Sequence, residues 1–278
     1  MKPTIRALSL QELAVLIDWA AAEGWNPGLD DAAAFHAADP EGFIGAFVGN
    51  EMVAAISAVA YGGDFGFIGL YICRPDMRGK GLGKAVWTAG MKRLAGRAIG
   101  LDGVEAQQAN YRRRGFRPAY ETIRYSGRGA GPAVRAERLR PVTTQLVPDI
   151  IAYDAQCFPA PRRAFLQRWP QPPHRGLAAI SSRGTTGYAV ARPCRAGFKI
   201  GPLFADDLDT GLHLLDGLAE ACQGGDLHID VPADNAAFIA ALEAAGFAPT
   251  FTTTRMYKGP APKLDLSRIF GVTTLELG

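Results

Sequence analysis

The sequence is poor in the residues that build metal centres and disulfide frameworks. Its 278 residues include four histidines and four cysteines, which are Cys73, Cys157, Cys194 and Cys222. The cysteines form no C-x-x-C pair and lie at large, irregular spacings, so no zinc-binding pattern can be written and we expect no metal. This number and spacing of cysteines favour free thiols in a reducing cytoplasm.

The chain also lacks a strong excess of either charge and any long apolar segment. Lys and Arg total 30 against 27 Asp and Glu, giving a net charge of +3. Dedicated nucleic-acid and membrane-surface binders carry a larger excess, so we predict neither partner. The longest apolar run, residues 52–60, is too short to span a bilayer, and early acidic residues argue against a signal peptide. These observations predict a cytoplasmic protein.

The residues that are present suit an ordinary globular protein, with 48% hydrophobic and 21% charged residues. We predict that Ser9 caps the N-terminus of a helix, because Glu12 follows it three residues later, as in a capping box. Turn residues and apolar periodicity predict the other elements of the first half. We expect strands at 4–8, 42–48, 52–61, 65–73, 98–101 and 116–125, and helices at 10–24, 31–38, 82–97 and 105–114.

The second half of the sequence repeats part of the first. Gly115-Phe116-Arg117-Pro118 matches Gly246-Phe247-Ala248-Pro249, and Thr122-x-Arg124 matches Thr253-x-Arg255 at the same offset. A strand and a helix precede both copies, which favours a duplication. We therefore predict two α/β units with mixed sheets, at 1–127 and 142–278, joined by a linker at 128–141 that has no apolar period.

A glycine-rich loop at residues 73–84 carries the strongest functional signal. It lies between a predicted strand and a predicted helix, where glycines let the backbone approach a ligand closely. The first N–H groups of the helix and its dipole form an anion site suited to a pyrophosphate, with Arg78, Lys80 and Lys84 adding charge. The loop has no Ser or Thr after Gly83-Lys84, as a Walker A loop requires, and its glycines do not follow the G-x-G-x-x-G Rossmann spacing.

This loop resembles motif A of the GNAT N-acetyltransferases, [Q/R]-x-x-G-x-[G/A], which here is Arg78-x-x-Gly81-x-Gly83. The order of elements through residue 125 also matches that family. The resemblance implies acetyl-CoA binding by two groups of residues. The pyrophosphate would lie on Gly79, Lys80, Gly81, Leu82, Gly83 and Lys84, and the pantetheine along Tyr71, Ile72 and Cys73, where the family has a bulge that separates two strands.

A second match, Ala109-x-Tyr111-x-x-x-Gly115-Phe116, is similar to the family's tyrosine-bearing helix. The resemblance gives Tyr111 the role of protonating the departing CoA thiolate while an amine attacks the thioester directly. A backbone N–H near Ile72 and Cys73 would polarise the carbonyl. Val104 stands where the family often has Asn, so that contact is not expected. Because the family transfers the acyl group directly, we expect no covalent role for Cys73.

The acceptor side of the reaction has weaker signals. Glu23, Trp25 and Asn26 lie in a segment that borders the acceptor site in the family, and we take them as candidate substrate residues. The general base is left open, because the strand at 65–73 contains no carboxylate. Glu23, Asp30 and Asp64 are the candidates, and each also suits a cap or turn.

The second half lacks the donor-site residues of the first. No R-x-x-G-x-G follows residues 200–205, three aspartates (206, 207 and 209) would repel a pyrophosphate, and Leu242 replaces the tyrosine. This pattern resembles two-domain bacterial GNAT proteins with a degenerate second domain, which would shape the acceptor pocket, bind a regulator or form a homodimer. The alternating segment 269–277 predicts a strand that covers a sheet edge.

These observations favour an acetyl-CoA-dependent N-acetyltransferase whose acceptor is the amine of a small or amino-acid-like molecule. Two alternatives remain open at this point. One is a non-enzymatic acyl-CoA sensor read out by the second half. The other is a peptidyl or aminoacyl transferase built from paired GNAT-like domains, which would take its acceptor across both halves.

Overall fold

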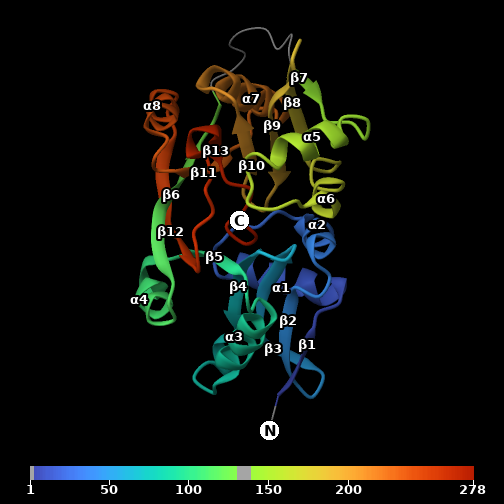
Figure 1. The fold of residues 1–278 in the computed structure, drawn as a ribbon, viewed down its shortest axis with the longest axis vertical. Helices are drawn as coiled ribbons and strands as arrows, with labels where there is room; N and C mark the ends of the chain where they lie inside the picture. Colours follow the sequence, from blue (N-terminus) through green and yellow to red (C-terminus); the bar gives the residue numbers. More distant parts are fainter. Residues whose placement is uncertain (1–2, 130–138) are drawn as a thin grey trace.

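The chain folds into one mixed sheet of 13 strands with helices packed on its faces, as the computed structural model of residues 3–129 and 139–278 shows (Figure 1). The predicted α/β class with a mixed sheet is confirmed. In the first half the elements are β1 (Thr4–Ala7), α1 (Leu10–Ala22), α2 (Asp31–Ala38), β2 (Phe43–Val48), β3 (Glu51–Tyr61), β4 (Phe65–Cys73), α3 (Leu82–Arg93), β5 (Ala98–Gly103), α4 (Glu105–Arg113) and β6 (Arg117–Gly127).

The local signals of the first half produced the expected elements. The capping box is present, since the Ser9 hydroxyl accepts the Glu12 N–H and the Glu12 side chain accepts the Ser9 N–H. Helix α3 ends at Arg93 rather than at 97, because the chain leaves the helix through a turn that contains Gly96 at φ 85°. The order of strands and helices through β6 is the predicted one.

The second half repeats this plan with differences at both of its ends. Its elements are β7 (Leu139–Pro141), α5 (Val147–Asp154), α6 (Arg163–Leu166), β8 (Arg175–Ser181), β9 (Gly184–Pro193), β10 (Phe198–Ala205), α7 (Leu208–Ala221), β11 (Leu227–Pro232), α8 (Ala236–Ala244), β12 (Ala248–Lys258) and β13 (Ile269–Gly271). The predicted linker therefore ends in a strand, because residues 139–141 pair with β8 and Leu139 packs on the second-half core. Linker residues 130–138 lie outside the described residues.

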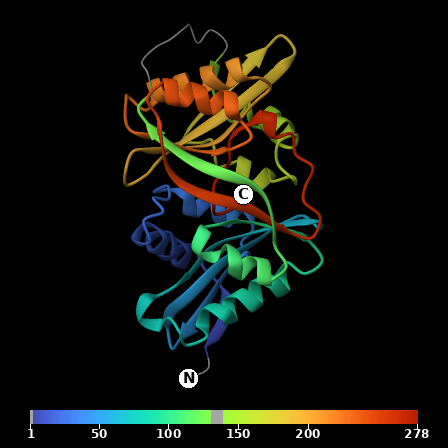
Figure 2. The same cartoon turned by 90° about the vertical axis from the view of Figure 1, so that its left-hand side faces the viewer.

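The two halves exchange their last strands. Strand β12 of the second half pairs with β5 of the first, and β6 of the first half pairs with β11 of the second. The two exchanged strands also pair with each other, and they run side by side across the middle of the molecule (Figure 2). Phe35 stacks on Trp169 with ring centroids 5.8 Å apart, so the halves also share a hydrophobic core.

The segment predicted as one strand over 269–277 is a strand only over Ile269–Gly271. The Thr274 hydroxyl accepts the N–H groups of Glu276 and Leu277, which turns the chain and ends the extended run. Strand β13 pairs with β10, and the Val272 N–H donates to Asp230 O on β11. The segment thus fills an internal gap of the sheet rather than covering its outer edge.

Candidate active site

The first half contains an open gap between two parallel strands. Strands β4 and β5 pair only from Phe65 to Ile68, opposite residues 98–101, and then separate. Leu70 has a φ of 44°, and the β3–β4 register shifts beside it, which is the bulge that the resemblance predicts. Beyond the bulge, Tyr71, Ile72 and Cys73 present a strand edge that has no strand on the β5 side.

The backbone of this edge can bind an extended ligand. The Arg74 N–H donates to Val53 O on β3 at 3.0 Å. Because donors alternate along a strand, the Cys73 N–H points the other way, into the gap. The Arg78 Nε donates to Cys73 O at 3.0 Å and closes the end of the edge. The Ile72 side chain is buried in the core, so only its backbone is available to a ligand.

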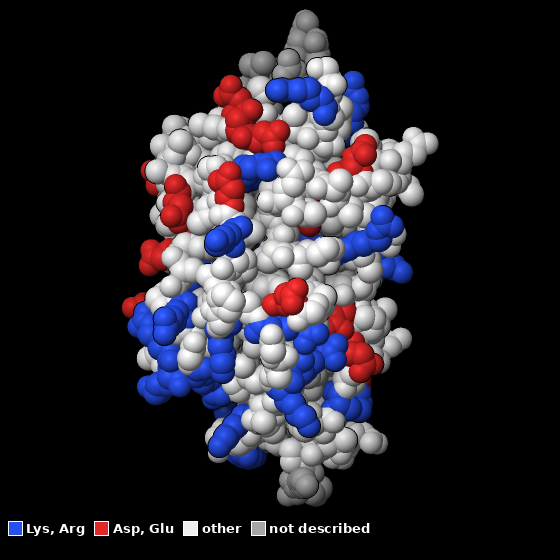
Figure 3. All heavy atoms as spheres, viewed as in Figure 1, with Lys and Arg blue, Asp and Glu red and all other residues white. Residues whose placement is uncertain are grey.

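The glycine loop forms an open cradle at the start of α3. Gly79 and Gly81 have φ values of 78° and 79°, and no atom lies within 4 Å of the place where a Cβ would stand on either residue. The N–H groups of the first turn of α3 have no partner within the helix, and Lys80 and Lys84 are exposed beside them. The Leu82 side chain is buried, so it would also contribute only its backbone. These residues fit a pyrophosphate, and on the face that Figure 3 shows basic side chains gather over this half of the molecule.

Tyr111 lies on α4 in the wall of the pocket that begins at the gap. Its ring stacks on Trp87 at 5.6 Å and meets Phe116 edge to face at 6.2 Å. Burial raises the pKa of Tyr111 to about 12, so the hydroxyl stays protonated at neutral pH and can act as an acid. Burial also raises the pKa of the Cys73 thiol, which disfavours a thiolate nucleophile there.

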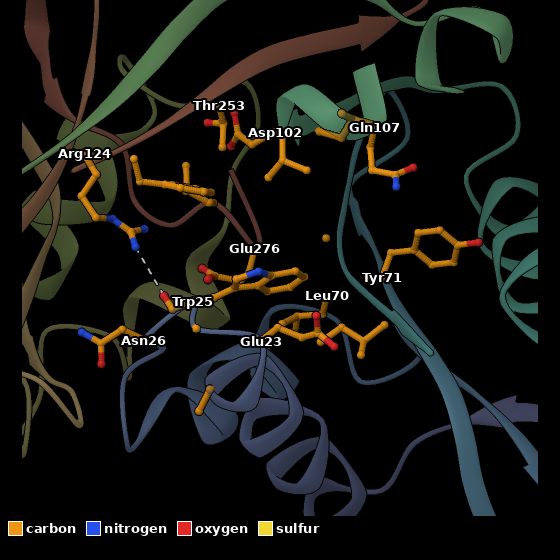
Figure 4. Close-up of a pocket in the computed structure, with 18 of the residues that line it drawn as sticks. Glu23, Trp25, Asn26, Leu70, Tyr71, Asp102, Gln107, Arg124, Thr253 and Glu276 are labelled. Atoms are coloured by element: carbon orange, nitrogen blue, oxygen red, sulfur yellow. Dashed lines mark hydrogen bonds between the residues drawn. The ribbon is translucent and has the colours of Figure 1, made fainter. Parts of the chain in front are cut away.

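The gap opens into a pocket of about 1120 Å³ between the two halves (Figure 4). Both halves supply its walls. The first half contributes the Glu23–Asn26 segment, residues 68–73 of β4 and Tyr111, and the second half contributes Arg195, Ala196, His228, Thr250, Phe251, Thr253, Leu275 and Glu276. The gap between β4 and β5, which we call the donor gap, is therefore continuous with this large cavity.

The predicted acceptor residues Glu23, Trp25 and Asn26 all line this pocket, where contacts across the molecule hold them. The Glu23 carboxylate pairs with Arg78 Nη2 at 2.5 Å. The Asn26 amide donates to Ala196 O at 2.8 Å and accepts the Ala196 N–H at 3.1 Å. The Trp25 carbonyl accepts Lys199 Nζ at 2.9 Å.

Two of the three candidate bases lie away from the pocket. Asp30 and Asp64 are both exposed, and neither lines the cavity. Asp30 precedes α2, and Asp64 stands in the turn between β3 and β4. Glu23 does line it, but its carboxylate is already paired.

Several polar residues that face the cavity were missed by the sequence reasoning. Arg124 forms a two-pronged pair with Asp230, at 2.7 and 3.0 Å, and its Nη1 donates to the Trp25 carbonyl at 3.4 Å. The Ser126 hydroxyl lies 2.7 Å from His228 Nδ1, and His228 Nε2 lies 3.1 Å from Ala196 O. The only sequence feature that pointed to any of these residues was the repeat, in which Arg124 matches Arg255.

Asp102 and Glu276 are two further carboxylates at this pocket. Asp102, on β5, is fully engaged with Arg255 at 2.8 and 2.9 Å. Glu276 comes from the segment that follows β13. No local sequence motif predicts either residue, because the pairing of strands from the two halves brings both to the pocket.

The corresponding gap of the second half is closed by the chain itself. Strands β10 and β11 pair over Phe198–Ile200, and β13 then lies against β10 at Leu203 and Phe204. The Asp207 carboxylate accepts the Thr210 N–H at 2.8 Å, so it caps α7 where the first half offers an anion site. Leu242 is buried in the core. Among residues 139–278, the second half therefore offers no groove comparable to that of the first.

Comparison with known families agrees with this architecture. A model described as "Acetyltransferase (GNAT) family" matches residues 10–116, and one described as "Acetyltransferase (GNAT) domain" matches residues 150–271. A holothin acyltransferase of a Pseudoalteromonas strain is 32% identical over 277 residues, which are 99% of this chain and 94% of that protein. The chain belongs to the GNAT family, with a GNAT domain in each half, and it is an acyltransferase.

Solved structures show the same fold. A Pyrococcus horikoshii protein described as a candidate acetyltransferase superposes with a TM-score of 0.83 at 20% identity, covering 100% of this chain and 96% of that one. A tandem GNAT protein from the clavulanic acid biosynthesis pathway gives 0.61 at 13% identity, covering 94% of this chain and 100% of that one. Within residues 3–129 and 139–278, no helix is long and apolar enough to cross a membrane.

Proposed function

We propose that this acyltransferase moves an acetyl group from acetyl-CoA to the amine of a small molecule. The observation that carries the proposal is the continuity of the site. An open glycine cradle leads along a free strand edge, past a protonated tyrosine, into a cavity between the halves. The kinship with a holothin acyltransferase supports acyl transfer, and holothin belongs among the acceptors to be tested.

The first half supplies the donor side in this proposal. Gly79–Lys84 hold the pyrophosphate by backbone N–H groups, with Arg78, Lys80 and Lys84 adding charge, and the edge at Tyr71–Cys73 pairs with the pantetheine. The bound donor supplies a thioester carbon that an amine can attack. The Cys73 N–H faces that region and suits the carbonyl oxygen. Tyr111 donates a proton to the leaving sulfur.

Two substitutions test this proposal separately for binding and for chemistry. Gly81→Asp places a carboxylate and a strained φ in the cradle, so we expect acetyl-CoA binding to be lost. Tyr111→Phe removes the acid, so we expect kcat to fall by about 10²-fold or more while donor binding stays near normal. Calorimetry measures binding and release of free CoA thiol measures turnover. Full activity in both variants would contradict the proposal.

The cavity between the halves also favours a second candidate, a peptidyl or aminoacyl transferase. Such an enzyme takes its acceptor across both domains, and here both halves line the pocket. An acceptor panel of free amines, holothin and short peptides distinguishes the two. Turnover restricted to peptides or to aminoacyl donors would select the second candidate, and acetyl-CoA binding without turnover would select a sensor.

A further inference from the structure

Glu276 is a buried carboxylate that faces the acceptor end of the pocket without a partner. Its exposed fraction is 4%, and its Oε2 makes no hydrogen bond to any residue within 3–129 and 139–278. The other pocket carboxylates, Glu23 and Asp102, are both committed to arginines. Figure 4 draws Glu276 among the lining side chains, in the region of Trp25 and between Arg124 and Leu70 in that view.

The structure holds Glu276 firmly at this place. The Ser57 hydroxyl donates to Glu276 O at 3.2 Å, and the Thr274 hydroxyl accepts the Glu276 N–H at 3.2 Å. A Cβ on Gly69 would stand 2.2 Å from Glu276 O, so only glycine permits this approach to β4. Gly69 immediately precedes the bulge at Leu70. Glu276 is therefore anchored beside the point where the donor gap begins.

The charged groups around Glu276 are already engaged with other partners. Four of them, on four strands, interact with it electrostatically, namely Asp102 on β5, Arg124 on β6, Arg192 on β9 and Lys199 on β10. Arg124 is paired with Asp230, Arg192 with Asp31, and Lys199 with the Trp25 carbonyl. A buried carboxylate that retains a free oxygen in such surroundings can receive a cation from the cavity.

Building on the proposed function, we propose that Glu276 binds the ammonium group of a basic primary amine and takes its proton. The walls of the same pocket include Trp25, Phe251 and Leu275, which suit an apolar or aromatic body behind the amine. Glu276 thus fills the role of base that no residue of the β4 strand supplies, and it defines the acceptor as a cationic amine on a small apolar framework.

The protons and electrons of this step balance with Glu276, Tyr111 and solvent alone. One ammonium proton goes to the Glu276 carboxylate, and the nitrogen lone pair forms the C–N bond as the C–S bond breaks. The thiolate takes a proton from Tyr111. The remaining nitrogen proton passes to solvent as the amide forms, solvent reprotonates Tyr111, and Glu276 releases its proton to solvent. The net products are the amide, the free thiol and one proton.

The test compares a basic amine with a weakly basic one in Glu276→Gln. Benzylamine is an ammonium ion at neutral pH and needs a base, whereas aniline is already neutral. With acetyl-CoA as donor, we expect kcat for benzylamine to fall about 10²- to 10⁴-fold in the variant. We expect the aniline rate and the acetyl-CoA affinity to stay close to those of the unchanged chain. Glu220→Gln, on the exposed face of α7, is the matched control.

The outcomes separate this inference from the function on which it rests. Equal rates for benzylamine in the variant and the unchanged chain, or equal losses for both amines, would overturn the role of Glu276. An unchanged chain that acylates no amine overturns the proposed function and the inference with it. If Glu276→Gln does not fold, Glu276→Asp, which keeps a carboxylate on a shorter side chain, decides in its place. A larger loss of kcat for benzylamine than for aniline supports the base, and equal losses refute it.

Discussion

Arg124 and Arg255 occupy equivalent places in the repeated sequence, and the structure gives them equivalent partners. Each lies on an exchanged strand and forms a two-pronged pair with an aspartate of the other half, Asp230 and Asp102 respectively. Burial alone would raise the pKa of Asp230, but the Arg124 guanidinium lowers it overall. The repeated arginine is thus explained by the connection between the halves.

The Asp102–Arg255 pair predicts a large but cooperative effect on stability. Asp102→Asn leaves a buried guanidinium without its counter-charge, so we expect the free energy of unfolding to fall by about 3–5 kcal/mol. Replacing both residues, as Asp102→Leu with Arg255→Met, leaves no unpaired charge and should cost much less than the single change. Urea unfolding of the unchanged chain, Asp102→Leu, Arg255→Met and the double variant measures this coupling. Two single losses that simply add in the double variant would contradict the coupling.

At the scale of residues, the sequence predicted what local chemistry determines. Ser9 with Glu12 and the cradle glycines Gly79 and Gly81 act through neighbours a few positions away, so their spacing reveals them. Glu276 could not be found in this way. It reaches the pocket through contacts with Ser57 and Gly69, which are distant in the sequence, and its surroundings contain no motif.

At the scale of elements, one of the two gaps in the sheet is open and the other is filled by the chain. Between β4 and β5 the strand edge is open beside a glycine cradle, whereas between β10 and β11 the chain inserts β13. A Cβ on Gly201 would stand 2.2 Å from Thr273 O, which shows how closely the inserted segment fits. The same architecture is therefore open to a ligand in one half and closed in the other.

This difference predicts a single donor site per chain. Titration of the unchanged chain with acetyl-CoA in a calorimeter should give one binding event per chain, because the second gap is occupied by β13. Gly81→Asp should remove that event entirely. A second site, or binding that persists at full stoichiometry in Gly81→Asp, would contradict the closed second groove.

The order of elements could be predicted from the sequence, but the pairing of the last strands could not. Periodicity and turn residues place β6 within a few residues of its observed bounds, and the repeated residues mark β12 as its counterpart. Both strands carry the same repeated residues, so each could pair with either half. The exchange depends on which arrangement joins the buried arginines to the aspartates of β5 and β11, and that is a property of the whole sheet.

At the scale of the whole molecule, the near-neutral net charge conceals an asymmetry. On the face that Figure 3 shows, basic side chains gather over the half that holds the glycine cradle, where an anionic donor would be attracted. The second half contributes residues of the pocket between the halves, such as Phe251 and Glu276. The exchanged strands and the shared core fix these two surfaces relative to each other, so donor and acceptor can meet in one defined place.

We propose transfer of an acyl group from a donor on the first half to an amine held between the halves. Measuring free CoA thiol and acylated amine together, with acetyl-CoA and a panel that includes benzylamine, aniline and holothin, decides whether it occurs. We expect at least one amine to be acylated, with one thiol released per amide formed. Tight acetyl-CoA binding with no acylated amine, or thiol released without amide, would contradict it.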